Sequence, residues 1–88
     1  MSETLRTYPV SDQVQVMFKL REALTAQGTV FEEIGEALKF VVHTAVGGIG
    51  MLVDPSPSVI EVQILNKPWL VSYDDIWNKV DKLLKENT

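Results

Sequence analysis

Apolar residues recur with helical spacing in two parts of the chain. Between residues 12 and 27 they cover most of a helical circumference, which is wider than the apolar stripe of an ordinary surface helix. Ser11 is a suitable N-cap, and Gly28 suits the left-handed residue that ends a helix. A narrower stripe follows Ser72, which has an acidic residue three positions later as in a capping box. The pattern therefore predicts one helix at 12–27 and another that closes the chain.

Residues 29–46 permit two interpretations. Thr29 and Glu32 have the spacing of a capping box. Polar residues also align along one side of a helix, opposite an apolar line: Glu32, Glu36, Lys39 and His43. The β-branched run at 40–46 instead suits a strand that turns at Gly47-Gly48 into the next strand. We favour a helix that ends at residue 46, and the choice between helix and strand for residues 40–46 stays open.

Two later segments have the pattern of strands. Residues 59–65 alternate apolar and polar positions, as a half-buried antiparallel strand does, and residues 49–53 are continuously apolar. The proline-rich stretch 54–58 is expected to be the turn between them, because proline cannot donate to a sheet ladder. Residues 69–71 are a candidate third strand.

These elements predict a single α+β domain that comprises residues 1–88. It has two N-terminal helices, a small antiparallel sheet of two to three strands and a C-terminal amphipathic helix. Residues 1–10 and 86–88 are expected to be poorly ordered.

Composition and charge narrow the function classes. The chain of 88 residues has no cysteine, which excludes a disulfide framework and thiolate chemistry. Its net charge is −4, and the acidic excess falls within residues 29–66, which argues against binding to a phosphate backbone. The most apolar stretch, 38–53, is too short for a membrane span, and residues 1–10 do not resemble a signal peptide. We therefore expect a cytoplasmic protein that binds neither nucleic acid nor membrane.

Three glycines, Gly47, Gly48 and Gly50, form the only candidate ligand loop. Glycines allow backbone amides to approach an anion closely. Phosphate loops, however, lie between a strand and a helix N-terminus, whereas these glycines follow the expected helix. The simpler interpretation is a helix end followed by a closely packed strand.

Polar residues offer little catalytic chemistry. Glu32, Glu33 and Glu36 form a candidate patch for a basic partner, although acidic residues are also typical of the first turn of a helix. His43 is the single histidine and has no second ligand at metal-binding spacing, so no metal or cofactor is expected. Without a base and an orienting group for a nucleophile, the chain is not expected to be an enzyme.

The excess of apolar helix surface suggests a protein-protein interaction domain. Uncovered apolar patches usually meet a partner, and a two-fold dimer is the commonest closed solution. We therefore expect a homodimer, or an adaptor or inhibitor that binds another protein. The candidate interface residues are Met17, Phe18, Leu20, Leu24 and Trp69. The alternative is a module that binds a small ligand or anion at residues 47–50.

Overall fold

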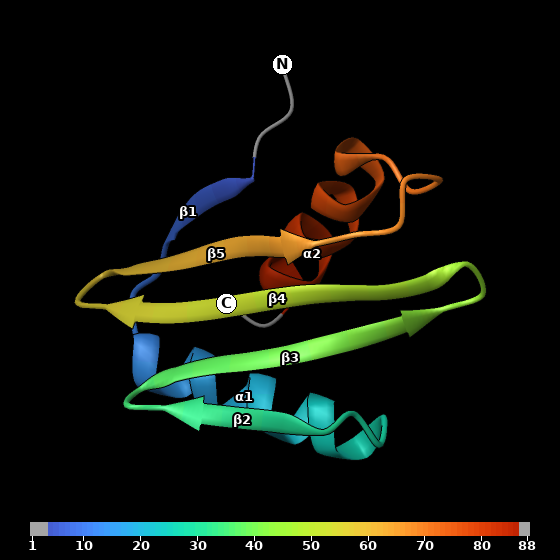
Figure 1. The fold of residues 1–88 in the computed structure, drawn as a ribbon. Coiled ribbons are helices and arrows are strands. Elements are labelled where there is room, and N and C mark those ends of the chain that lie inside the picture. Colours follow the sequence, from blue (N-terminus) through green and yellow to red (C-terminus); the bar gives the residue numbers. More distant parts are fainter. Residues whose placement is uncertain (1–3, 87–88) are drawn as a thin grey trace.

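The fold is a five-stranded antiparallel sheet with two helices (Figure 1). The computed structural model describes residues 4–86 of the chain. The elements in chain order are β1 (Leu5–Pro9), α1 (Gln13–Ala26), β2 (Phe31–Ile34), β3 (Ala37–Thr44), β4 (Gly47–Ser56), β5 (Val59–Asn66) and α2 (Tyr73–Glu86). The strand order in the sheet is β1-β5-β4-β3-β2, so α1 carries the chain from one edge of the sheet to the other.

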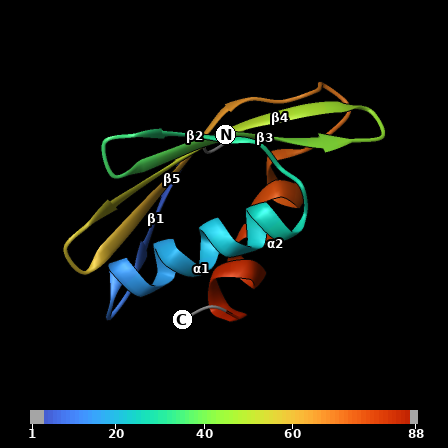
Figure 2. The same cartoon turned by 90° about the horizontal axis from the view of Figure 1, so that it is seen from below.

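Both helices lie on the same face of the sheet, and the opposite face is uncovered (Figure 2). The strands direct alternate side chains toward the helices, where they form the core with the apolar stripes of α1 and α2. Register pairs continue this apolar surface from strand to strand, as with Phe40, Met51 and Ile64. The side chains that are least exposed are Trp77, Leu38, Ile60 and Val62.

The predicted α+β class is confirmed, as are the helix predicted at residues 12–27 and the helix that closes the chain. Asp12, rather than Ser11, caps α1 by accepting a hydrogen bond from the Gln15 backbone N–H, and Gly28 has the expected positive φ of 72°. At α2 the Ser72 hydroxyl accepts from the Asp75 backbone N–H at 3.1 Å, as the capping spacing predicted.

The predicted helix at 29–46 is wrong, because these residues form the hairpin of β2 and β3. Gly35, with φ of 62°, occupies the two-residue turn that joins the strands, and a positive φ there matches the twist of a hairpin. Glu32 and Lys39 are register partners in this hairpin, so their helical spacing has a different origin. The β-branched run at 40–46 is the sequence signal that outweighed the helical alignment.

The sheet is also larger than the predicted two to three strands. The β3–β4 turn is at residues 45–46, two residues before the glycine pair at which the strand interpretation had placed it. Strand β4 continues through the proline-containing segment up to Ser56, and Ser58, with φ of 68°, closes the turn into β5. Residues 69–71 are not a strand.

Strand β1 was not predicted, since residues 1–10 were expected to be poorly ordered. Residues 5–9 pair with β5 in register from Leu5 opposite Gln63 to Pro9 opposite Val59. The inward side chains of β1 are Arg6 and Tyr8. Because both are polar, the strand does not show the alternation of apolar and polar residues by which strands are predicted. Residue 86, which was also expected to be poorly ordered, is the last residue of α2, and residues 1–3 and 87–88 lie outside the described residues.

Candidate interaction site

An apolar cleft of about 810 Å³ lies between α1, α2 and the inner face of the sheet. The two helices do not pack closely against each other, and the cleft is the space between them above the sheet. Leu20 and Leu24 form the α1 wall, and Ile76 and Leu83 belong to the α2 wall. The floor consists of inward side chains of the central strands: Phe40, Ile49, Met51, Val53 and Val62.

The rim of the cleft carries apolar side chains that are accessible to solvent. Val42, Val46, Leu70 and Leu83 are between 36% and 61% exposed, and each lines the cleft. A cleft whose floor and rim are both apolar is typical of a surface that binds a partner or ligand, because single exposed apolar residues are ordinary but a contiguous set is not.

Few charged groups face this cleft. Asp75 and Lys79, one turn apart on α2, are the ionisable side chains among its lining residues in the described part of the chain. Their opposite charges leave the cleft without a strong field of either sign. The site can therefore take an apolar group, but its lining offers no general acid, base or nucleophile with an orienting partner.

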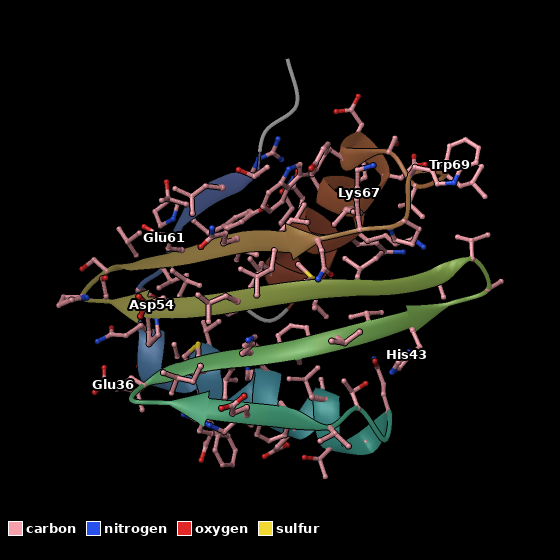
Figure 3. All side chains as sticks on the ribbon, viewed as in Figure 1. Glu36, His43, Asp54, Glu61, Lys67 and Trp69 are labelled. Atoms are coloured by element: carbon pink, nitrogen blue, oxygen red, sulfur yellow. The ribbon has the colours of Figure 1, made fainter. Side chains whose placement is uncertain are left out.

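The predicted interface residues do not form one surface. Met17, Leu20 and Leu24 are buried in the core, and the two leucines also line the cleft. Phe18 is 53% exposed on α1 and lies outside the cleft. Trp69 is 86% exposed in the loop before α2 and projects away from the sheet, also outside the cleft (Figure 3).

The candidate ligand glycines lie in strand β4 and make room for neighbouring side chains. A Cβ at Gly50 would be 2.6 Å from the Asn66 Oδ1, and one at Gly47 would be 2.9 Å from Pro68 Cγ. The Gly50 backbone N–H donates to that same Asn66 oxygen at 2.9 Å. These glycines serve close packing, and they do not form a loop of free amides around an anion.

The three glutamates of the predicted basic-partner patch point in different directions. Glu33 accepts a hydrogen bond from Arg21 Nε of α1 at 2.9 Å, which places it on the helix side of the sheet. Glu32 is the register partner of Lys39 on the uncovered face, and Glu36 lies in the β2–β3 turn. No shared acidic surface results.

A different acidic pair appears only in the folded sheet. Asp54 of β4 and Glu61 of β5 are register partners, and both are exposed on the uncovered face (Figure 3). Like charges directly opposite each other on neighbouring strands are destabilising. Because the pairing depends on strand register, nothing in the linear sequence marks these two residues as neighbours.

The ionisable groups with shifted pKa values belong to an anchor between β1 and α2. Asp81 accepts hydrogen bonds from the Tyr8 hydroxyl and from Arg6 Nη1, the latter at 3.0 Å to Oδ2. Burial, then the hydrogen bond to Asp81, raises the pKa of Tyr8, and the hydrogen bond from Tyr8 lowers the pKa of Asp81. Arg6 also lies 4.9 Å from the ring centre of Trp77. This cluster attaches α2 to the edge of the sheet, and its residues do not line the cleft.

Residues 4–86 contain neither a metal-binding cluster nor a membrane-spanning helix. No group of three or more His, Cys, Asp or Glu side chains is arranged to hold a metal ion. Neither helix in this part of the chain is long and apolar enough to cross a membrane.

The rim residues were the part of the site that sequence reasoning missed. Val42 and Val46 were assigned to a helix, and Leu70 to a short strand, so their common location could not be recognised. Leu83 was correctly placed on the apolar stripe of the last helix, but the stripe does not show which of its residues are exposed.

Comparison with known proteins finds no family model, no curated protein and no solved structure that matches this chain.

Proposed function

We propose that this chain is a protein-interaction domain that binds an apolar segment of another protein in the cleft between α1 and α2. The observation that carries the proposal is the combination of an apolar floor with an exposed apolar rim at Val42, Val46, Leu70 and Leu83. Filling the cleft would remove this surface from water, which is the main favourable contribution in most protein association.

The shape of the cleft favours a different protein over a second copy of this chain. A two-fold dimer uses the same patch on both copies, and two concave clefts cannot fill each other. Phe18 and Trp69, exposed apolar residues that could enter a cleft, lie elsewhere on the chain. Their insertion into the cleft of a second copy closes into a dimer only when it is reciprocal about one two-fold axis, which requires the inserted side chain and the cleft to lie within one self-complementary patch. We therefore commit to a different protein as the occupant, and the expected homodimer becomes an outcome of the test.

Two matched substitutions test the cleft. Leu83→Asp places a charge on the rim, whereas Phe18→Asp places the same charge on an exposed residue outside the cleft. Affinity capture from native lysate, quantified by mass spectrometry, should recover a specific protein with the wild type and with Phe18→Asp. We expect recovery to fall about tenfold with Leu83→Asp, which corresponds to burial of one unpaired charge at an interface.

Thermal unfolding of both variants provides the control for folding. Equal recovery with both variants would refute the cleft as the binding surface. A dimeric mass by light scattering that Phe18→Asp reduces to a monomer would instead support the interface expected from the sequence.

The volume of the cleft supports a second candidate, a small apolar ligand. Small-molecule sites typically measure about 300–1,000 Å³, and this cleft has about 810 Å³. Native mass spectrometry of the protein purified from its own source should then show an added mass of a few hundred daltons, on the order of a ligand that fills such a site. Loss of that mass with Leu83→Asp, but not with Phe18→Asp, would place the ligand in the cleft.

A further inference from the structure

Half of strand β3 has no neighbour on one side. Strand β2 pairs with β3 from Ala37 to Phe40 only, while β4 pairs with it from Leu38 to Thr44. Residues 41–44 therefore form an open edge of the sheet, and Figure 1 shows β3 extending beyond the start of β2. All four of these residues are exposed.

The alternation of hydrogen bonds identifies which backbone groups face this edge. In an antiparallel ladder, successive residues direct their N–H and C=O groups to opposite neighbours. Thr44 and Gly47 close the two-residue β3–β4 turn, so Thr44 and Val42 bond toward β4. Val41 and His43 consequently direct their N–H and C=O groups away from β4. Among residues 4–86, no backbone group pairs with them on that side.

This edge lacks the features that protect the other edges of the sheet. Natural edges are commonly blocked by proline, by charged side chains or by bulges. Edge strand β1 contains Pro9, and β2 contains Glu32 and Glu33. Residues 41–44 are Val-Val-His-Thr, with high strand propensity, no proline and no permanently charged residue. An unprotected edge of this kind is a template for another strand.

We propose that an extended segment of another protein pairs with residues 41–44 as an added strand. The inference rests on the proposed interaction function and gives it a binding mode, in which backbone hydrogen bonds supply affinity and alternate side chains supply specificity. A partner residue opposite Val42 would lie on the helix side of the sheet, since residues opposite each other in a ladder share a face. Val42 and Thr44 both line the cleft, so apolar residues are favoured at these alternate positions.

A second copy of this chain fits the edge poorly. Two-fold pairing through Val42 would place Thr44 of the second copy opposite Phe40, where Phe31 already pairs. Two-fold pairing through His43 avoids this collision but puts Val41 opposite Ala45, which lies in the turn. A free extended segment has neither restriction, so the proposal commits to a different protein.

A displayed library of random linear peptides supplies the probe. Peptides enriched on the wild-type protein should slow hydrogen exchange at the Val41 and His43 amides on binding. The Val42 and Thr44 amides should change little, because they already donate to β4. This measurement needs no variant, and protection confined to other residues, or failure of any peptide to enrich, would overturn the proposal.

Proline substitutions test the same edge by affinity. His43→Pro removes an outward N–H without removing a bond to β4, and edge strands tolerate proline. Thr7→Pro is the matched control, because Thr7 also directs its N–H outward, on the opposite edge of the sheet. We expect the enriched peptide to bind His43→Pro about tenfold more weakly and Thr7→Pro as tightly as the wild type.

The two proposals can fail separately. Weaker peptide binding with His43→Pro but not with Leu83→Asp would support the edge and refute a role for the cleft. The reverse result would refute the edge. A dimer in light scattering that His43→Pro converts to a monomer would overturn the choice of a different protein as occupant.

Discussion

Asp81 is predicted to contribute more to stability than its position on a partly exposed helix suggests. Its carboxylate accepts hydrogen bonds from Tyr8 and Arg6, both on β1. Strand β1 is an edge strand that the sequence pattern did not reveal, and these bonds connect it to α2. Asp81→Ala should therefore loosen both elements at once.

The expected magnitude follows from the two hydrogen bonds and the exposure of the groups. A hydrogen bond to a charged group contributes about 1.5–3 kcal/mol, whereas an exposed ion pair contributes about 0–1 kcal/mol. The side chains of Arg6 and Asp81 are 34% and 35% exposed, so the ion pair falls near the lower limit. We expect Asp81→Ala to cost about 2 kcal/mol, which lowers Tm by about 10 °C in a domain of this size.

Denaturant unfolding followed by circular dichroism measures this loss, and Asp54→Ala is the control. Asp54 is a carboxylate on β4 that lies exposed opposite Glu61, so its removal should leave stability unchanged or slightly higher. In a double-mutant cycle, Tyr8→Phe should cost less in the Asp81→Ala background than in the wild type. Equal loss of stability from Asp81→Ala and Asp54→Ala would refute this reasoning.

The pH dependence gives an independent check of sign. Because the folded-state pKa of Asp81 is lowered, its contribution is present above the unfolded pKa of about 4 and is lost as pH falls through the folded value. The pKa of Tyr8 is raised, so its contribution is present below about pH 10 and is lost as pH rises through the folded value. The difference in stability between wild type and Asp81→Ala should therefore be greatest between about pH 5 and 9.

Two further substitutions test packing and charge in the sheet. Gly50→Ala should lower the free energy of unfolding by about 1–2 kcal/mol, because its Cβ meets Asn66 Oδ1, and in an Asn66→Ala background the same change should cost nothing. Retention of the full cost in that background would contradict the packing explanation. Glu61→Lys should stabilise by about 0.2–1 kcal/mol by placing opposite charges across β4 and β5, and added salt should reduce the gain. No change at low salt would show that the two side chains avoid each other.

Local signals predicted the parts of the fold that local interactions determine. Helix α2 has a capping serine, a narrow apolar stripe and opposite charges one turn apart, all of which favour the same structure. Strand β5 alternates apolar and polar residues as a one-sided sheet requires. In each of these segments, residues within about one turn or a few positions of each other favour one secondary structure, and the tertiary structure keeps it.

The β2–β3 hairpin was missed because its polar residues fit two periodicities. Glu32 and Lys39 are seven apart, which places them on one side of a helix and also opposite each other across a two-residue turn. The position of Gly35 was the local sign of that turn, since a positive φ is readily adopted by glycine. Pairing of β3 with β4 across the turn at residues 45–46, which the spacing of the polar residues does not reveal, favours the hairpin over the helix.

The candidate site could not be predicted either, because it exists only in the tertiary structure. Its walls come from α1, α2 and the central strands, so it depends on how these elements are arranged in the fold and not on a sequence motif. The apolar excess that suggested an interface was real, but most of it covers a five-stranded sheet that the sequence analysis underestimated. Leu20 and Leu24 illustrate this, because they are buried in the core and still line the cleft.

The two proposed binding features share a strand, and this sharing constrains how a partner can bind. Val42 directs its side chain to the cleft, while the adjacent Val41 and His43 direct their backbone groups to the open edge. At the opposite edge, β1 is attached to α2 through Tyr8 and Asp81. Within residues 4–86, an open strand edge and the cleft thus lie together near the β3–β4 hairpin. A partner that combined backbone pairing with side-chain burial would therefore bind at this end, and a substitution in β1 should leave its affinity unchanged.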